Sequence, residues 1–299
     1  MNRALLLFGA LVMSGGNPVH GQAFSDDTFS DADWQVHVFT LGIGGSVTGT
    51  QDAFGNPGPS RRVVDVVNAG SGGQRGAWGF HLRTNASYAP SLHGGISQLD
   101  FSLDFANLSS CQTGGDGQAF GPCIKQDGEL YAIYGITLTS TAWQTRLMIG
   151  VQSSDFQRFD PTTATFQSAF HPDFSSSGGL MEFGFFTANS SPSLGYNRCV
   201  AYDNWSWLLH PADTTPPTLS CPPAVAVIDS KGGIPGAVVV FTITATDDVD
   251  PSPTVVCAPP SGSFFPRGTT SVACTATDVS GNQSMCTFPV IVQPTIRVR

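Results

Sequence analysis

Glu129 and Glu182 are the residues of this chain best suited to acid–base chemistry. Of its 22 acidic residues these two are the only glutamates, and the other 20 are aspartates. Both fall in segments with strand-like alternation, and Glu182 points away from the face shared by Met181, Phe183 and Phe185. A glycoside hydrolase places two carboxylates on opposite walls of a cleft, one as acid and one as nucleophile or base. The pair therefore predicts, as an alternative function, a polysaccharide-active hydrolase.

A plainer interpretation exists for both glutamates, because no glycosidase signature surrounds either one. Glu129 follows Asp127-Gly128, a turn signal, and so is equally consistent with the start of an edge strand. The six histidines show no i, i+4 pairing, so the spacing of a zinc site is missing from the sequence. The leading interpretation is therefore a protein without catalysis.

Aromatic and polar residues gather between positions 78 and 88. This segment contains Trp78, His81, Arg83 and Tyr88, and Tyr131 lies in a second segment. An aromatic ring in a groove offers apolar area beside polar groups, which suits stacking against a sugar ring. These five are the first-choice ligand-binding residues, although a single aromatic residue more often packs in the core. Two further aromatic residues are candidates for stacking on a sugar ring, Trp143 and Tyr196.

The elements that must position these residues are strands. Charged residues make up 12% of the chain, while 34 glycines and 21 prolines disfavour long helices. Residues 98–105 alternate apolar and polar side chains, and 130–138, 143–149, 181–185 and 201–209 repeat the pattern. With 40% hydrophobic residues, including 21 phenylalanines, the chain has material for a packed core. Composition and alternation predict an all-β protein.

A proline-rich linker at residues 211–217 (PADTTPP) divides the chain into two domains. Residues 24–210 are predicted to form an antiparallel jelly-roll sandwich, and 218–293 a smaller β-sandwich followed by a tail, 294–299. Residues 1–23 contain a positive side chain, an apolar run of ten and small residues at the end. That pattern predicts a secretory signal peptide and a secreted, extracellular protein.

Charge and hydropathy exclude two classes of partner. The net charge of −9 provides no electrostatic basis for binding a phosphate backbone, so nucleic acid is not expected. No later stretch approaches 18 consecutive apolar residues, so membrane insertion is not expected.

The second domain resembles a known family, the hyalin repeat (HYR) domain, over residues 213–293. The matching stretches are TPPTLSCP (215–222), ATDD (245–248), PPSGSFFPRGTT (259–270), CTATDVSGN (274–282) and CTFPVIV (286–292). The resemblance implies an immunoglobulin-like sandwich of extracellular adhesion and surface proteins, with no catalysis of its own.

The first domain resembles secreted bacterial jelly-roll modules of the lectin and carbohydrate-binding type. The resemblance rests on FSDDTFSDADW (24–34) and YDNWSW (202–207). It implies a structural calcium ion bound by an aspartate just before the last strand, a place that Asp203 matches. Asp26 and Asp27 lie at the other end of the domain, and the terminal strands of such sandwiches often lie side by side, so we predict a calcium site from these three. Turns capped by aspartate side chains are the alternative.

The second domain also holds a looser group of aspartates near the linker, Asp213, Asp247, Asp248 and Asp250. They are candidates for a weaker cation site, although turn formation accounts for them more simply.

Seven cysteines in an exported chain leave one without a partner. Cys111 and Cys123 bracket a glycine-rich loop, and a disulfide between them is predicted. Cys199 is then left over, as a buried free thiol or as a reactive or intermolecular one.

In the second domain, four cysteines allow three pairings. The immunoglobulin-like resemblance favours Cys221 with Cys286 and Cys257 with Cys274. A bond between Cys274 and Cys286 across the final hairpin is the alternative.

The sequence thus predicts a secreted, non-catalytic binding or adhesion protein. Residues 24–210 are expected to bind a polysaccharide or a cell-surface or matrix component, with the HYR domain as spacer or interaction module. The hydrolase and a purely structural matrix protein without a small ligand are the alternatives.

Overall fold

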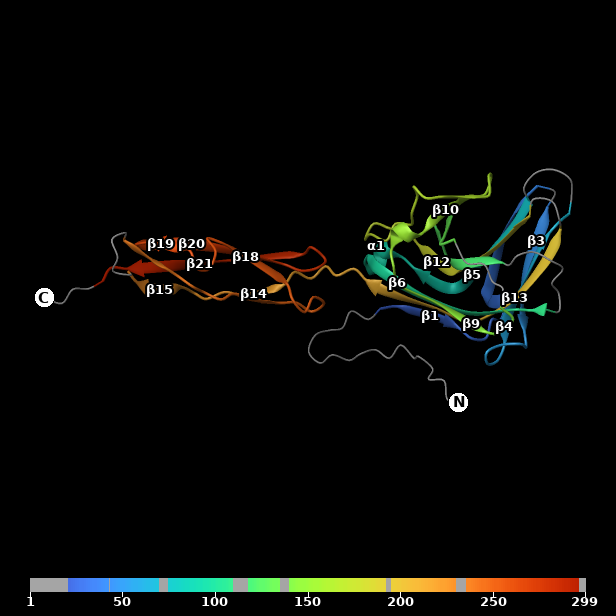
Figure 1. Ribbon diagram of the computed structural model, residues 1–299, viewed down its shortest axis with the longest axis horizontal. Helices are drawn as coiled ribbons and strands as arrows, with labels where there is room; N and C mark the ends of the chain where they lie inside the picture. The colour runs from blue at the N-terminus through green and yellow to red at the C-terminus, as the bar shows by residue number, and fades with distance from the viewer. Residues whose placement is uncertain are drawn as a thin grey trace. The chain divides into compact units, whose positions relative to one another are not determined.

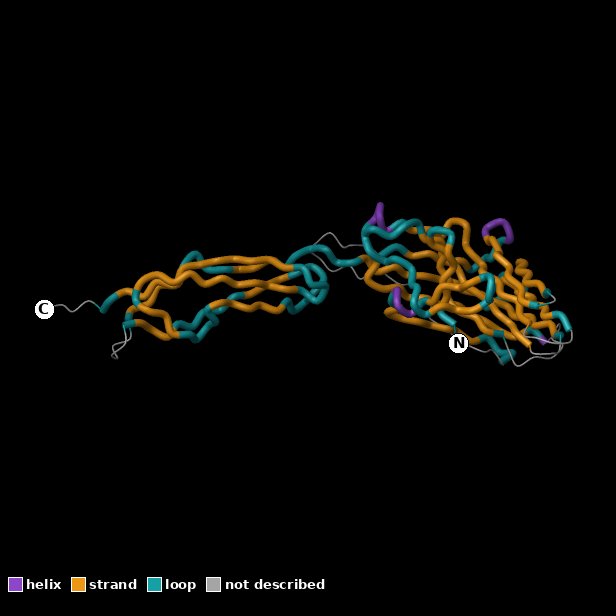
Figure 2. Tube along the Cα trace, turned by 90° about the horizontal axis from the view of Figure 1, so that it is seen from above, coloured by secondary structure: helices purple, strands orange, loops and turns teal. Residues whose placement is uncertain are grey.

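The computed structural model describes residues 21–42, 44–69, 75–109, 118–134, 140–191, 195–229 and 235–295. Most of the predicted signal peptide, residues 1–20, lies outside the described residues. The described residues form two units that meet in the sequence between Ala212 and Asp213. Strands dominate both units (Figure 1 and Figure 2).

The first unit consists mainly of antiparallel strands. Its strands are β1 (Ala23–Asp26), β2 (Trp34–Leu41), β3 (Gly45–Asp52), β4 (Ser60–Val67), β5 (Arg75–Tyr88), β6 (Ile96–Asn107), β7 (Ala119–Gln126), β8 (Glu129–Ala132), β9 (Gln144–Val151), β10 (Gln157–Asp160), β11 (Thr165–Gln167), β12 (Met181–Ser191) and β13 (Tyr196–Pro211). Its helical segments are short: α1 (Pro90–His93) and the 3-10 turns η1 (Asp31–Asp33) and η3 (Ser153–Asp155). Within the described residues, no helix has the length and apolarity to cross a bilayer.

The strands of the first unit form two sheets. One has the order β3-β4-β13-β6-β9, and β1 pairs with β13 beyond the end of β4. The other has seven strands in the order β11-β10-β8-β7-β12-β5-β2. All of these pairings are antiparallel. The predicted all-β, antiparallel fold class is confirmed.

The main core of the first unit lies between its two sheets. Leu99, Phe101, Leu103 and Phe105 of β6 are all buried there, as their alternation predicts. The seven-stranded sheet contributes a matching set of side chains, among them Phe183 and Phe185 of β12. Trp205 and Trp207 of β13 are buried in the same core. Aromatic side chains from both sheets thus hold the two layers together.

The second unit is a smaller β structure with a mixed sheet. Its strands are β14 (Thr218–Ser220), β15 (Val225–Ile228), β16 (Gly236–Val238), β17 (Thr244–Thr246), β18 (Thr254–Ala258), β19 (Phe264–Pro266), β20 (Gly268–Thr277) and β21 (Gln283–Gln293). The four-stranded sheet has the order β15-β21-β20-β18, with β15 parallel to β21, and two-stranded pairs β14-β17 and β16-β19 complete the unit.

Two disulfides cross the second unit. They join Cys221 to Cys286 and Cys257 to Cys274, which is the pairing that the immunoglobulin-like resemblance favoured. Cys274 on β20 has a cross-strand neighbour on each side, Cys257 on β18 and Cys286 on β21. It is bonded to Cys257, and Cys286 is bonded to Cys221, so the hairpin alternative is not realised.

A buried carboxyl group lies inside the first unit. Asp65 on β4 is fully buried, and its Oδ2 accepts hydrogen bonds from the Gln118 amide and from Asn189 Nδ2 at 2.9 Å. Thr187 Oγ1 donates to Oδ1 at 3.3 Å. Burial raises the pKa of Asp65 to about 7, although these hydrogen bonds act to lower it.

We predict that Asp65 makes the first unit less stable as the pH rises toward neutrality. Its pKa in the folded state lies above the ordinary value of 3.8, so between about pH 4 and pH 7 the native state binds more protons than the unfolded state. The free energy of unfolding of the wild type, relative to Asp65→Asn, should therefore fall by up to about 1.4 kcal/mol per pH unit in that window. Tryptophan fluorescence during urea unfolding measures this for the first unit, since all 5 tryptophans lie in it.

The control for this comparison is Asp155→Asn, because Asp155 is exposed and does not act on Asp65 or Asp203. Its stability profile should run parallel to that of the wild type. A parallel profile for Asp65→Asn as well would contradict the prediction.

Candidate functional site

The seven-stranded sheet is curled around a second group of apolar side chains. In the sheet order, β5, β12, β7 and β8 separate β2 from β10, which corresponds to about 24 Å in a flat sheet. The ring centroids of Phe39 on β2 and Phe159 on β10 are nevertheless 5.2 Å apart. The sheet therefore bends back on itself, with Trp78, Phe80 and Leu82 on its inner side. We call this side, which faces away from the main core, the concave face.

A continuous aromatic cluster lines the concave face. Neighbouring ring centroids lie 5.1 to 6.4 Å apart, within the range of favourable aromatic contacts. The cluster comprises Phe39, Trp78, Phe80, Tyr134, Phe159, Phe166 and Phe186. Phe80 and Phe186 are fully buried, whereas Tyr134 is 58% exposed at the edge of the cluster. The cluster thus combines a packed floor with an open aromatic rim.

A pocket opens beside Trp78 at this rim. It has a volume of about 200 Å³. Its lining comprises Leu41, Trp78, Tyr134, residues 163–166 and residues 188–190. A Cβ atom added at Gly76 would lie only 2.3 Å from the nearest carbon of the Trp78 indole ring. Glycine at position 76 is therefore what allows the indole to lie beside the pocket.

Charged and polar side chains occupy another part of the concave face. Lys125 on β7 and Glu182 on β12 are cross-strand neighbours, and Lys125 Nζ lies 2.8 Å from Glu182 Oε2. Burial, and then the positive charge of Lys125, lower the pKa of His37, although Glu182 acts to raise it, so the imidazole is neutral at pH 7. From Glu182 to Ala188 along β12 the face extends roughly 20 Å. It therefore runs from an ionic end to an aromatic end.

Among the predicted ligand-binding residues, Trp78 lies on the concave face, whereas His81 and Arg83 lie on the opposite one. Consecutive side chains of β5 point to alternate faces, so the strand separates them. His81 is fully buried and stacks on Phe185, with centroids 4.7 Å apart. Arg83 Nε forms an ion pair with Asp26 Oδ2 at 2.8 Å. Both residues therefore support the fold.

Tyr88 and Tyr131 also lie away from the concave face. The hydroxyl of Tyr88 donates to the backbone oxygens of His93 at 3.0 Å and Gly94 at 2.8 Å, which fixes the end of α1. Tyr131 packs against the main core. The predicted contact patch is therefore not assembled as such, because period-two alternation distributes it over both faces of one sheet.

The two glutamates of the hydrolase alternative point to opposite faces of the sheet. Cross-strand partners share a face, so Glu182, Lys125 and Leu130 lie together on the concave face. Glu129 precedes Leu130 in β8 and points the other way, where its Oε2 lies 4.0 Å from Arg158 Nε. The two carboxylates therefore do not flank one cleft, as paired-carboxylate hydrolysis requires.

Only part of the predicted calcium group comes together: Asp27 lies near Asp203, whereas Asp26 points to the other side of the sheet. Asp26 lies inside the unit, where its carboxylate accepts hydrogen bonds from Thr28, Phe29 N at 2.9 Å and Trp34 Nε1 at 2.8 Å. These bonds hold its pKa below the ordinary value, although burial acts to raise it. Together with Arg83, they occupy both oxygens of the Asp26 carboxylate.

Asp203 lies on the other side of its sheet, beside the cross-strand neighbour Asp104. The backbone N–H groups of Asn56 and Asn204 donate to its two oxygens. The pKa of Asp203 is raised to about 6, mainly by burial and with a smaller effect of the nearby Asp104 and Asp27, although the two hydrogen bonds act to lower it. Both oxygens of the carboxylate that the sequence predicted as the centre of a metal site thus already accept hydrogen bonds from the protein.

The prediction of a disulfide between Cys111 and Cys123 is wrong, because Cys123 is not disulfide-bonded. Cys123 is a free, buried thiol that packs in the aromatic cluster of the concave face. Cys111 lies outside the described residues. Cys199, which was expected to be left over, is disulfide-bonded. The strand register explains the difference, because it turns the Cys123 side chain into an apolar interior.

Sequence reasoning missed most of the residues that line the concave face. Phe39, Tyr134, Phe166, His37 and Lys125 were not candidates. Alternation did place Tyr134 on the same side as Leu130 and Ala132, and the structure confirms that shared face. The remaining signal was weak, because alternation does not show which face of a sheet a distant strand will approach.

The second unit is assigned by comparison with known families. Residues 212–292 match the family model of the HYR domain. The resemblance seen in the sequence is thereby confirmed for this part of the chain. A search of curated proteins finds no match.

Several solved structures are similar to the chain at low identity. A xylan-binding domain of carbohydrate-binding module family 22 shares 14% identity over 64% of this chain and 97% of its own, with a TM-score of 0.33. A structure from a study of β-sandwich carbohydrate-binding modules shares 10% identity over 62% of this chain and 61% of its own, with a TM-score of 0.32. The glycoside hydrolase domain of Endo-D from Streptococcus pneumoniae R6 shares 10% identity over 86% of this chain and 37% of its own, with a TM-score of 0.30.

We predict that Cys123 is inert to thiol reagents in the folded protein. Its side chain is fully buried, and burial raises the pKa of the thiol well above its ordinary value. Because the thiolate is the reactive form, Ellman's reagent should react with no thiol in the native protein and with one per chain after unfolding without reductant. Rapid reaction of the native protein, or the same count in unfolded Cys123→Ala, would contradict this.

Proposed function

We propose that the first unit binds a polysaccharide chain along its concave face, without catalysis of its own. The observation that carries the proposal is a single face, roughly 20 Å long, that joins an exposed aromatic rim to hydrogen-bonding side chains. Sugars present both apolar ring faces and hydroxyl groups, so they need both kinds of contact at once.

The pocket supports binding of one ring of an extended ligand. Its volume of about 200 Å³ is below the roughly 300–1,000 Å³ of pockets that enclose a whole drug-sized ligand. Tyr134 offers an exposed flat apolar surface there, with the largely buried Trp78 beside it. The hydroxyls of Thr163 and Thr165 lie 2.8 Å apart on an exposed edge of the same pocket. A sugar ring at the rim, with its neighbours extending toward Lys125, would use these groups together.

The ionic end of the face supports binding in preference to hydrolysis. Glu182 forms an ion pair with Lys125 on this face, whereas Glu129 points to the opposite one, so the two glutamates do not face one ligand. Lys125 and Glu182 together provide a donor and an acceptor for sugar hydroxyls.

We further propose that the protein is secreted, with the HYR domain as a spacer or an interaction module for surface or matrix components. Two disulfides brace this small domain, and such bonds persist in oxidising, extracellular compartments.

We predict that Tyr134→Ala weakens polysaccharide binding about three- to tenfold, which corresponds to the loss of one aromatic stacking contact. The measurement is retention of the full-length protein on xylan, cellulose, mannan and agarose, followed by a dissociation constant for any polysaccharide that retains it. Tyr134 is largely exposed, so its removal should leave the fold intact.

The matched control is Trp143→Ala, which removes a ring that stacks on Phe54 at 5.7 Å outside the aromatic cluster. It should bind as the wild type does. An equal loss of polysaccharide binding in both variants would contradict the proposal, and so would a wild type that is retained on none of the four polysaccharides. Soluble sugar released by the wild type and not by Glu182→Gln would show an enzyme instead.

A further inference from the structure

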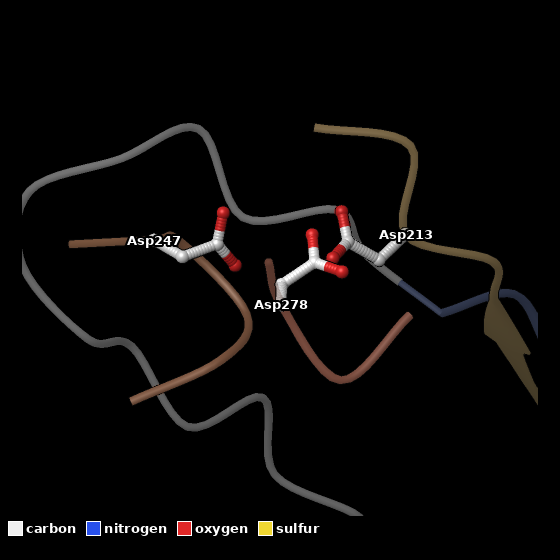
Figure 3. Close-up of side chains that lie close together, drawn as sticks. All are labelled: Asp213, Asp247 and Asp278. Atoms are coloured by element: carbon white, nitrogen blue, oxygen red, sulfur yellow. The ribbon is translucent and has the colours of Figure 1, made fainter. Parts of the chain in front are cut away.

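Three aspartates from separate segments of the HYR domain converge at one end of it. Asp247 directly follows β17, Asp278 directly follows β20, and Asp213 lies in the segment that leads into β14. Because β14 pairs with β17, this leading segment runs beside the loop that carries Asp247. Figure 3 shows the three carboxyl groups facing one another.

In two of these three carboxylates, turn formation uses only one of the two oxygens. Asp213 Oδ1 accepts a hydrogen bond from Thr215 N at 2.9 Å, and Asp247 Oδ1 accepts from Val249 N at 3.0 Å. The second oxygen of each, Oδ2, is closed off from solvent and receives no hydrogen bond from the described residues. A buried anionic oxygen without a donor is costly, and a cation would remove that cost.

Asp278 is the most deeply buried member of the group. Its side chain is 6% exposed and accepts hydrogen bonds from Asn282 N at 2.8 Å and Asn282 Nδ2 at 2.9 Å. Asn282 Nδ2 also donates to the backbone oxygen of Asp213 at 3.2 Å, which links Asp278 to the leading segment.

No basic side chain of the described residues neutralises this group. In the described part of the HYR domain the basic residue is Arg267, and it forms an ion pair with Asp229. Three carboxylates held together without a counter-charge repel one another. This contrasts with Asp26 and Asp203 in the first unit, whose oxygens are served by protein donors.

We propose that Asp213, Asp247 and Asp278 bind one calcium ion in the HYR domain. One oxygen of each lies within 4.8 Å of the other two. Two ligands on opposite sides of calcium lie up to about 5 Å apart, at about 2.3–2.6 Å per bond, whereas magnesium allows only about 4.2 Å. Calcium also tolerates irregular loop ligands, and water can complete its coordination. The bound ion would tie the leading segment to the loops after β17 and β20.

Calorimetric titration of calcium chloride into the metal-free, full-length protein tests this site. The matched variants are Asp247→Asn and Asp248→Asn, which change neighbouring residues. Asparagine at position 247 keeps the side-chain oxygen that accepts from Val249, so the turn is preserved, whereas Asp248 is exposed and outside the group. Asp213→Asn is a second variant in the leading segment.

We expect the wild type to bind calcium with a dissociation constant of about 10⁻⁴ to 10⁻³ M, as extracellular modules do. Asp247→Asn and Asp213→Asn should each weaken this binding at least tenfold, and Asp248→Asn should leave it unchanged. Circular dichroism checks that the variants are folded. The proposal is overturned if the wild type binds no calcium, or if both Asp247→Asn and Asp213→Asn titrate as the wild type does. The test does not depend on polysaccharide binding.

Discussion

Everything in the first unit depends on one sheet that buries aromatic side chains on both of its faces. Phe183 and Phe185 of β12 point into the main core, while Phe186 of the same strand points into the concave face. Burial on the first face holds the two sheets together, and contact between rings on the second face keeps the sheet curled. A flat sheet would expose the second set to water, at about 25 cal/mol for each Å² of apolar surface. The concave face therefore exists because of the same packing that forms the fold.

The curl also determines what the face can do. It brings β10 and β11 over toward β2, so that Phe159 packs against Phe39 and Phe166 against Phe186, and Tyr134 is left as an open rim. The small residue Gly76 leaves room for the indole of Trp78 beside the pocket. Shape and chemistry thus arise from long-range packing of segments that are far apart in the chain.

The fold class could be predicted from the sequence because strand alternation is a local signal. The burial of Leu99, Trp205 and Trp207 follows directly from it. The site could not be predicted in the same way, because Trp78 and His81 are three residues apart in one strand and point to opposite faces. The pairing of Cys123 failed for the same reason, since the register that buries its thiol is set by β8 and β12. The four cysteines of the HYR domain were paired correctly, because a family resemblance supplied their spatial relation.

The central claim is that ligand contacts the concave face, and NMR of the labelled full-length protein tests it most directly. The titrant is an oligosaccharide cut from whichever polysaccharide retains the protein. The account predicts shift changes at the Trp78 indole, at the Tyr134 ring and at Lys125, with none at Trp143. Changes centred on Trp143 and the six-stranded sheet, with the Trp78 and Tyr134 signals unmoved, would contradict it.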